Sequence, residues 1–357
     1  MKIKIISPLI INSTDYINIP IVIENRDRHS INMLDMEKIL MNSSNRKELT
    51  KLFMQYFNSG NIRQIFDKLQ DYYSRIPDLD NYKIYPEIEY DEIEYDELDI
   101  KTSNISMPMG NYKDKKYIPY IPGSSIKGAI RNALRNNYIK KGGKVTGLEG
   151  RRDEKLDHSI FYMPQGNYKQ QITNDIMRFI EITDFYPVGD YKLKIHRIVR
   201  TKSNYSAQKI SSYAVTLDSG EFQGNITINN SLRFIKEAKL NNIIEIFKNL
   251  GVNLGNPTDF DGSIRDILKI TSNYYRDILA LEANYYNNIS CENPMAMGFG
   301  GGIEQKTVIP SLSNDDFKIV KRSIESKNRR IQLINKVPST HWEIDGHKFG
   351  IVDLSYE

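Results

Sequence analysis

The stretch that decides the fold is residues 120–135, which read Tyr120-Ile-Pro-Gly-Ser-Ser-Ile-Lys-Gly-Ala-Ile-Arg-Asn-Ala-Leu-Arg135. Pro122-Gly123 indicates a turn, and Ser124 or Ser125 is a suitable residue to cap the start of a helix. Apolar residues then recur every three or four positions, as on the buried face of an amphipathic helix: Ile126, Ala129, Ile130, Ala133 and Leu134. The pattern therefore predicts a helix over 124–138.

The start of this helix also has the features of a phosphate site. The first turn of a helix offers free N–H groups and the positive end of the dipole, and Ser124, Ser125 and Lys127 stand beside it. A glycine such as Gly128 lowers the stability of a helix by roughly 1 kcal/mol relative to alanine. We therefore expect that another backbone approaches Gly128 closely. Arg131 extends the basic face that Lys127 begins. The alternative is an ordinary capped helix whose basic face is solvated.

A second stretch, Gly298-Phe-Gly-Gly-Gly-Ile303, holds four glycines in five positions. It is not the dinucleotide fingerprint, because Ile303 stands where the third glycine of that motif belongs. Glycines are costly to order, so we expect this loop to place bare N–H groups against a ligand. The candidate binding residues are Gly298, Gly300, Gly301, Gly302 and Lys306. The alternative is a tight loop with a purely structural role.

A third candidate group lies on a predicted strand over 192–200 and just beyond it. It consists of His196, Arg197, Arg200 and Lys202. A general-base role for His196 is disfavoured, since no second histidine, tyrosine or carboxylate lies nearby in the sequence. We expect these residues to pack or to contact RNA.

Length and composition set the broad class. The 357 residues favour two domains, and 39% hydrophobic residues suffice for a buried core. A single cysteine rules out an internal disulfide and a cysteine-cluster zinc site, and the five scattered histidines show no helical metal spacing. We therefore expect no metal and no cofactor. The apolar run at the start is too short for a membrane span, and a soluble, cytoplasmic protein is expected.

Charge is distributed unevenly along the chain. Residues 78–99 contain ten acidic residues and one basic residue, whereas residues 113–155 contain twelve basic and four acidic residues. Two further basic runs cover 191–210 and 318–336. Such runs indicate a polyanionic partner for the basic segments, although each run taken alone is equally typical of a solvated face. We expect the acidic segment to lie away from a nucleic acid.

The order of predicted elements favours an α+β fold. Helical spacing covers 34–74, 124–138, 231–249, 263–287 and 313–327. Strand patterns cover 2–11, 178–184, 192–200, 213–217, 222–228 and 341–354, with a turn expected at Asp218-Ser-Gly. Residues 76–115 are expected to form a loop or a projecting hairpin. The regular alternation of a doubly wound sheet is absent.

These stretches resemble the RAMP proteins (repeat-associated mysterious proteins) of type III CRISPR effector complexes. The 121–131 segment is similar to their first-helix signature, and the Gly298 stretch with Lys306-Thr307 is similar to their late glycine-rich loop. Arg178-Phe-Ile-Glu-Ile-Thr-Asp184 resembles the family's strand that ends in aspartate, and Asp218-Ser-Gly-Glu-Phe-Gln-Gly resembles its Gly-x-Phe-x-Gly strand pair. The order of these motifs is most similar to the branch that forms the fifth subunit of the Csm (type III-A) complex.

The resemblance implies two ferredoxin-like (RRM-like) domains, over 1–230 and 231–357, with a helical insertion at about 25–115 in the first. It implies a non-catalytic subunit that binds crRNA, caps the 3′-end side of the complex and supports crRNA maturation and assembly. The implied partners are crRNA, a neighbouring backbone RAMP subunit, the small subunit of the Csm complex and host nucleases that trim crRNA.

Two alternatives stay open. One is a RAMP-fold CRISPR endoribonuclease with His29 or His196 as the general base. The other is a capping RAMP subunit of a Cmr (type III-B) complex.

Overall fold

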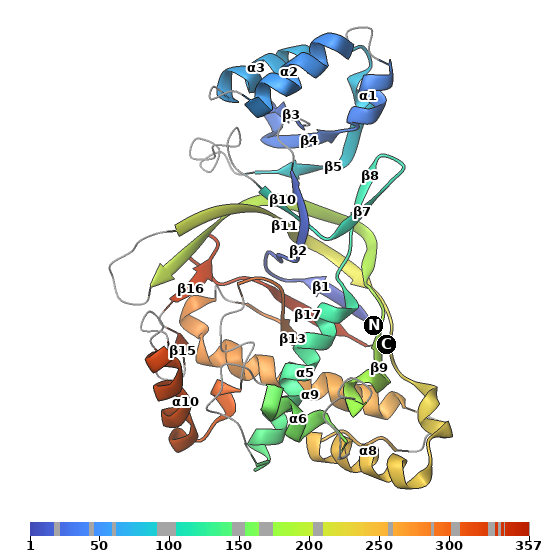
Figure 1. Cartoon of the computed structure of the whole chain (residues 1–357), viewed down its shortest axis with the longest axis vertical. Helices are drawn as coiled ribbons and strands as arrows, with labels where there is room; N and C mark the ends of the chain where they lie inside the picture. Colours follow the sequence, from blue (N-terminus) through green and yellow to red (C-terminus); the bar gives the residue numbers. More distant parts are fainter. Residues whose placement is uncertain are drawn as a thin grey trace.

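In the computed structural model of the chain, a 13-stranded sheet runs through the middle of the molecule (Figure 1). The structure describes residues 1–17, 22–42, 46–58, 62–90, 105–144, 154–163, 174–202, 210–255, 260–286, 289–300, 308–327, 333–334, 337–338 and 340–356. The main path of the sheet is β13 (Pro294–Ala296), β17 (Ile351–Ser355), β1 (Lys2–Ile5), β11 (Ile210–Gln223), β10 (Tyr186–Lys202), β5 (Lys83–Glu89), β4 (Ser30–Leu34) and β3 (Val22–Asn25). The α+β fold is thus confirmed.

Both ends of the chain contribute to this sheet. Lys2 of β1 lies opposite Ser355 of β17 on one side and opposite Gln223 of β11 on the other. The two termini therefore lie side by side (Figure 1). The strand predicted over 2–11 is shorter than expected, since β1 ends at Ile5 and the chain continues through one isolated bridge at Leu9.

Shorter strands branch from the main path. They are β2 (Asn12–Ile17), β6 (Ile105–Pro108), β7 (Gly110–Lys113), β8 (Lys116–Pro119) and β16 (Thr340–Glu343). Two small pairs lie apart from the sheet: β9 (Ile180–Ile182) with β12 (Ile226–Ile228), and β14 (Leu333–Ile334) with β15 (Val337–Pro338). Residues 76–115 therefore contain a strand of the main sheet, β5, as well as part of the projecting hairpin β7–β8.

The long antiparallel strands β10 and β11 form the backbone of the sheet. Lys192 lies opposite Ser219 and Leu193 lies opposite Leu217, so Asp218 is an extra residue on β11. The turn expected at Asp218-Ser-Gly is therefore wrong, because these residues form a β-bulge inside one strand. Gly220 has a φ of 134°, which explains a glycine there without any chain reversal.

A small lobe with its own core stands above strands β10 and β11 (Figure 1). Its helices are α1 (Met36–Asn42), α2 (Arg46–Asn58) and α3 (Ile62–Ser74), which confirms the helical prediction over 34–74. Leu49, Leu69 and Tyr73 are fully buried in its core. Strand β5 links the lobe to the main sheet, since Ile88 lies opposite Ile31 of β4 and Leu193 of β10.

Helices cover the opposite side of the sheet. They are α5 (Gly123–Lys140), α6 (Glu154–Phe161), α8 (Glu237–Leu250), α9 (Asp261–Leu281) and α10 (Asn314–Lys327). Short 3-10 helices are η2 (Arg26–Arg28), η3 (Leu79–Asn81), η5 (Ile176–Phe179), η6 (Asn230–Phe234), η7 (Ala283–Tyr285) and η8 (Ile309–Ser311). Ile126, Ile130 and Leu134 of α5 are fully buried against the main core, as their spacing predicted.

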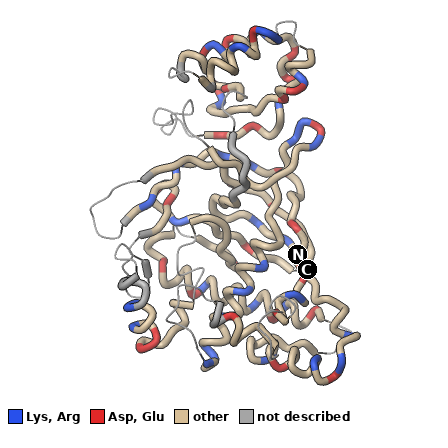
Figure 2. The backbone as a smooth tube through the Cα atoms, viewed as in Figure 1, with Lys and Arg blue, Asp and Glu red and all other residues tan. Residues whose placement is uncertain are grey.

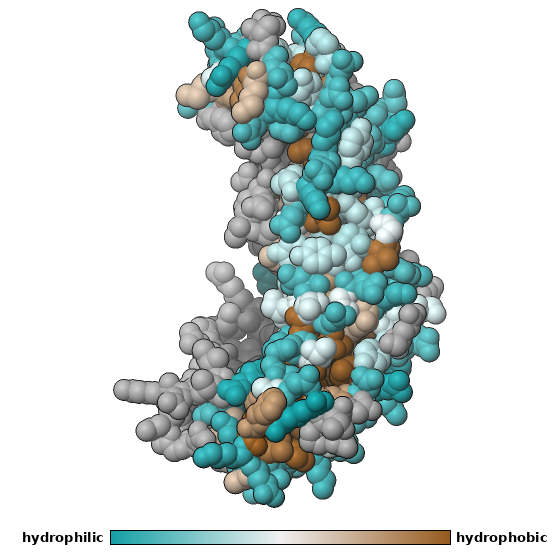
Figure 3. Space-filling model, turned by 90° about the vertical axis from the view of Figure 1, so that its right-hand side faces the viewer, coloured by the Kyte–Doolittle hydropathy of each residue, from teal (hydrophilic) through white to brown (hydrophobic). Residues whose placement is uncertain are grey.

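The surface is mixed in charge. Lysines flank Asp114 at the tip of hairpin β7–β8, and the lobe helices carry both signs (Figure 2). One side of the molecule is mainly hydrophilic, with small apolar patches in its middle and lower parts (Figure 3). Among the described helices, none combines the length and the apolar character needed to cross a membrane.

Candidate nucleic-acid interface

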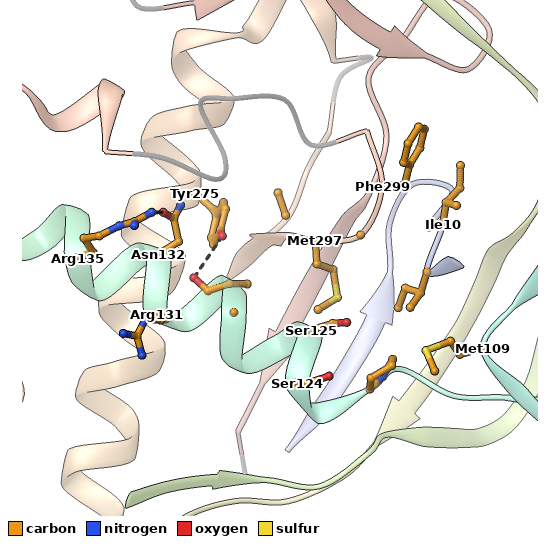
Figure 4. Close-up of a pocket in the computed structure, with 16 residues that line it drawn as sticks. Ile10, Met109, Ser124, Ser125, Arg131, Asn132, Arg135, Tyr275, Met297 and Phe299 are labelled. Atoms are coloured by element: carbon orange, nitrogen blue, oxygen red, sulfur yellow. Dashed lines mark hydrogen bonds between the residues drawn. The ribbon is translucent and has the colours of Figure 1, made fainter. Parts of the chain in front are cut away.

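A cavity of about 580 Å³ lies between α5 and the segment 296–299 (Figure 4). One wall is a single face of α5, with Ser124, Ser125, Gly128 and Arg131, and the other includes Met297, Gly298 and Phe299. Ile10, Ile11 and Met109 close one end, while Asn132, Arg135 and Tyr275 line the other. The cavity therefore joins the first and second sequence motifs, which are separated by more than 160 residues.

Helix α5 begins one residue earlier than the serines suggested. Its cap residue is Pro122, whose own side chain makes no capping hydrogen bond. The main-chain N–H of Gly123 instead donates a hydrogen bond of 2.9 Å to Oδ1 of Asp184. The prediction that Ser124 or Ser125 caps the helix is therefore wrong, because a carboxylate distant in sequence takes that role.

Both serines are instead placed on the cavity face of the helix. Ser124 is exposed and Ser125 is half-buried, and both line the cavity. Gly128, one turn further on, is exposed as well, and a Cβ built on it would meet no atom within 4 Å. Among the residues that the structure describes, no other backbone approaches Gly128, so that expectation is wrong for this part of the chain. Its missing side chain leaves open space at the cavity.

The guanidinium of Arg131 is held by two carboxylates. Its Nε lies 2.9 Å from Oδ2 of Asp157 and its Nη1 lies 2.6 Å from Oδ2 of Asp175, while the ring of Phe161 lies 4.2 Å from its central carbon. The buried Arg135 shares Asp157 at 3.1 Å. The part of the basic face nearest the cavity is thus neutralised by the chain itself.

Lys127 differs from these arginines. It is half-buried, and the described residues offer its ammonium group no ion pair within 4 Å. Burial lowers the pKa of Lys127, an effect that the attraction of Asp175 and Glu181 opposes. Unlike Arg131 and Arg135, Lys127 is therefore not neutralised by an ion pair with a described residue.

The glycines of the second motif serve close packing where they are described. Gly298 has a φ of 81°, and a Cβ on it would lie 2.4 Å from the main-chain oxygen of Ile10. The N–H of Phe299 donates to that same oxygen at 2.8 Å. Gly300 has a φ of 92° and faces the ring of Phe349. The remaining candidates of this loop, Gly301, Gly302 and Lys306, lie outside the described residues.

The third candidate group is not part of the cavity. His196 is only 3% exposed, and its Nε2 lies 3.0 Å from Oδ1 of Asp218, which lowers the pKa of that carboxyl. Arg197 is half-buried and Arg200 is exposed on β10, while the side chain of Lys202 lies outside the described part. The bulge at Asp218 thus supplies the carboxylate partner that no neighbouring residue in sequence suggested.

The apolar cavity residues escaped the sequence analysis. Ile10, Met109, Met297, Phe299 and Tyr275 come from four separate segments, and only Phe299 belongs to a glycine-rich pattern, which Met297 directly precedes. Only Met297 and Phe299 carried a signal, through their position on either side of Gly298. Across the described residues, no group of three or more histidine, cysteine, aspartate or glutamate side chains could hold a metal ion.

The sequence is similar to a known protein family and to a curated protein. A family model described as the RAMP superfamily matches residues 2–303. A curated protein of Methanocaldococcus jannaschii, described as CRISPR system Cms protein Csm5, is 30% identical over 230 residues. That alignment covers 58% of this chain and 51% of the relative, so the chain spans about half the length of the curated relative it matches.

Two solved structures share the fold. A chain of a Csm–crRNA–target RNA ternary complex from a type III-A CRISPR-Cas system superposes with a TM-score of 0.71 at 18% identity, over 99% of both chains. The Csm5 of T. onnurineus superposes with a TM-score of 0.60 at 16% identity, over 99% of this chain and 100% of that one. At these identities the likeness shows a common fold.

Proposed function

The chain belongs to the RAMP superfamily, and we propose that it is a non-catalytic, crRNA-binding subunit of a type III-A CRISPR (Csm) complex. In this proposal the subunit acts in the cytoplasm, caps the 3′-end side of the complex and supports crRNA maturation and assembly. One observation carries the proposal. The two motifs that resemble RAMP proteins most closely, at 121–131 and from Gly298, meet in one cavity.

The proposed architecture is two ferredoxin-like domains, over 1–230 and 231–357, with the lobe helices inserted into the first. Strands from both parts join one sheet: β1, β10 and β11 from the first, and β13, β16 and β17 from the second. Helices α5 and α9, one from each part, pack together beside the cavity, where Tyr275 Oη donates to the main-chain oxygen of Ala129 at 3.3 Å. This joint sheet and helix contact would hold the two halves in a fixed relation to RNA.

RNA would follow the rim of the cavity in this arrangement. Lys127 supplies positive potential on one side, near the start of α5, and the exposed Arg200 supplies it on β10. Arg131 and Arg135 would position α5 and α6 rather than neutralise phosphates, because their guanidinium groups already face Asp157 and Asp175. Binding of this kind is tolerant of sequence.

The proposed partners follow from the sequence resemblance, and a solved structure supports crRNA among them. The ternary complex whose chain shares this fold contains crRNA and a target RNA. We therefore propose crRNA, a neighbouring backbone RAMP subunit and the small subunit of the Csm complex as partners of this chain, together with host nucleases that trim crRNA.

The burial of His196 supports a non-catalytic role. A general base must reach the proton that it removes, whereas His196 is 3% exposed and is held by Asp218. His29 is half-buried and stacks on Tyr90, with 6.0 Å between the ring centres.

Co-expression tests the proposal directly. A tagged full-length chain should copurify with Csm subunits and crRNA, and deleting it from the operon should change the 3′ ends of the crRNA. Copurification with Cmr subunits instead would support the type III-B alternative. Purified chain should bind single-stranded RNA with an affinity that falls by roughly 0.7 log unit per log unit of salt for each phosphate engaged. Binding that salt does not change would contradict the proposal.

A further inference from the structure

The cavity between α5 and 296–299 is poorly suited to a phosphate. Two cationic residues belong to its described lining: Arg131 faces Asp157 and Asp175, and Arg135 shares Asp157. Each positive charge at the wall is therefore matched by a carboxylate of the same chain. A phosphate placed in the cavity would lose its hydration and meet carboxylates within the same ion-pair cluster.

The remaining lining is mostly apolar. Met297 and Phe299 lie opposite α5, and Ile10 and Met109 close one end of the cavity (Figure 4). The ring of Phe299 also packs against Trp342, with 5.2 Å between ring centres, which fixes its orientation. Such a wall favours a flat ligand with little charge, because aromatic and thioether groups stack well on planar rings.

Hydrogen-bonding groups lie along one side of this apolar wall. The hydroxyl groups of Ser124 and Ser125 line the cavity, and in the described part of the chain they make no hydrogen bond. Hydroxyl groups both donate and accept, so they could pair with the edge of more than one kind of ring. The volume of about 580 Å³ lies within the usual range for small-ligand pockets, roughly 300–1,000 Å³.

We propose that the cavity receives one unstacked nucleobase of the bound single-stranded RNA, while its phosphates stay outside at Lys127. This inference rests on the proposed function and adds to it the chemical group that the cavity recognises. The base stacks against Phe299 and Met297, and its edge meets Ser124 and Ser125. Because every base has an aromatic face, this contact anchors the strand at one nucleotide without demanding a particular sequence.

Gly128 offers a way to close the cavity without disturbing the fold. It lies in the middle of the lining face of α5, and a Cβ there meets no atom within 4 Å. Leucine is a good helix former, so Gly128→Leu should keep α5 intact while its side chain occupies the place of the base. Gly128→Ala adds a single methyl group and should leave room for the base.

Gly262 provides the matched control. It lies in α9, and a Cβ there also meets no atom within 4 Å. It does not line the cavity. Gly262→Leu therefore introduces the same side chain at a helical glycine elsewhere on the chain.

The experiment compares two RNA ligands on the full-length chain at one salt concentration. The first is a single-stranded oligonucleotide, and the second has the same length and charge but lacks every base. The wild-type chain and Gly262→Leu should bind the intact oligonucleotide about tenfold more tightly than the abasic one, as stacking of one base implies. Gly128→Leu should bind both alike, and Gly128→Ala should keep most of the preference.

The possible results separate the two proposals. If Gly128→Leu keeps the wild-type preference for bases, no base enters the cavity and the inference fails, while RNA binding stands. If neither ligand binds the wild-type chain, the proposed function fails and the inference falls with it. If Gly128→Leu unfolds in thermal melts, the wild-type chain and Gly262→Leu still test the inference. Equal affinity of the wild-type chain for both ligands would overturn the inference, whereas quenching of 2-aminopurine in the oligonucleotide by wild type and Gly262→Leu would support it.

Discussion

The main-chain N–H of Gly123 donates to Oδ1 of Asp184, and a Cβ on Gly123 would lie 2.2 Å from the main-chain oxygen of Ile182. The first turn of α5 is therefore seated directly on the end of β9. The carboxylate of Asp184 satisfies one N–H of the helix start and complements its dipole. The position of the helix start, and of the cavity beside it, is set by this contact.

Two glycines of α5 should respond to alanine with opposite signs. Gly123→Ala places a methyl group against main-chain atoms that cannot move aside easily, and should lower the free energy of unfolding by about 1–3 kcal/mol. Gly128→Ala meets open space and should raise it by about 0.5–1 kcal/mol, since alanine favours the helix more than glycine does. Chemical denaturation of the two variants beside wild type measures both. Equal effects at the two positions would contradict the described seating of α5.

Lys127 and Arg131 should divide between binding and stability. Lys127→Ala removes an unpaired charge and should weaken RNA binding by about 1 kcal/mol while the melting temperature stays close to that of wild type. Arg131→Ala removes the guanidinium that pairs with both Asp157 and Asp175, so the two carboxylates lose their common partner. The substitution should lower the free energy of unfolding by about 2 kcal/mol. RNA titrations and thermal melts on both variants give the comparison. A stable Arg131→Ala protein with lost RNA binding would show that Arg131 contacts RNA.

The pair His196–Asp218 should make stability depend on acid pH. The hydrogen bond from His196 lowers the pKa of Asp218 below its ordinary value of 3.8. A lowered pKa stabilises the fold at pH above 3.8, and this contribution is lost as pH falls through the lowered pKa. Asp218→Asn should cost about 1.5 kcal/mol at neutral pH. The difference in the free energy of unfolding between Asp218→Asn and wild type should shrink below pH 4, which urea unfolding at a series of pH values would show. A difference that stays constant with pH would exclude the His196–Asp218 pair as its cause.

Gly298 should be needed for folding rather than only for binding. A side chain at φ 81° is strained, and its Cβ would collide with the main-chain oxygen of Ile10. Gly298→Ala should therefore lower the free energy of unfolding by about 1–3 kcal/mol and displace one wall of the cavity. Thermal melts report the loss. Gly346→Ala is a suitable control, because Gly346 also has a positive φ of 78° but a Cβ there meets no atom within 4 Å.

The purified chain should leave RNA intact. Labelled CRISPR repeat RNA incubated with the chain, with and without Mg²⁺, should show no cleavage products on a denaturing gel, because His196 is buried and held by Asp218. Cleavage that disappears in His29→Ala or His196→Ala would establish the endoribonuclease alternative.

The sequence by itself determined the local elements and the class of the fold. Helical spacing located α5 and its buried residues Ile126, Ile130 and Leu134, and likewise the helices within 34–74. This succeeds because the burial of a helix face follows from the period of apolar residues, which is written in neighbouring positions. The motifs at 121–131 and from Gly298 also sufficed to indicate the family.

Only the tertiary structure decided which charges are satisfied and where the cavity lies. Arg131 meets Asp157 and Asp175, which lie 26 and 44 positions away, so a basic face in the sequence became a neutral ion-pair cluster. Asp218 lies at a β-bulge and makes a hydrogen bond with His196. The residues Asp218-Ser-Gly are equally typical of an ordinary turn, so their composition does not reveal the bulge. The apolar wall at Ile10, Met109 and Phe299 is assembled from distant segments. Such pairings depend on how the sheet brings those segments together, and no local pattern in the sequence encodes that geometry.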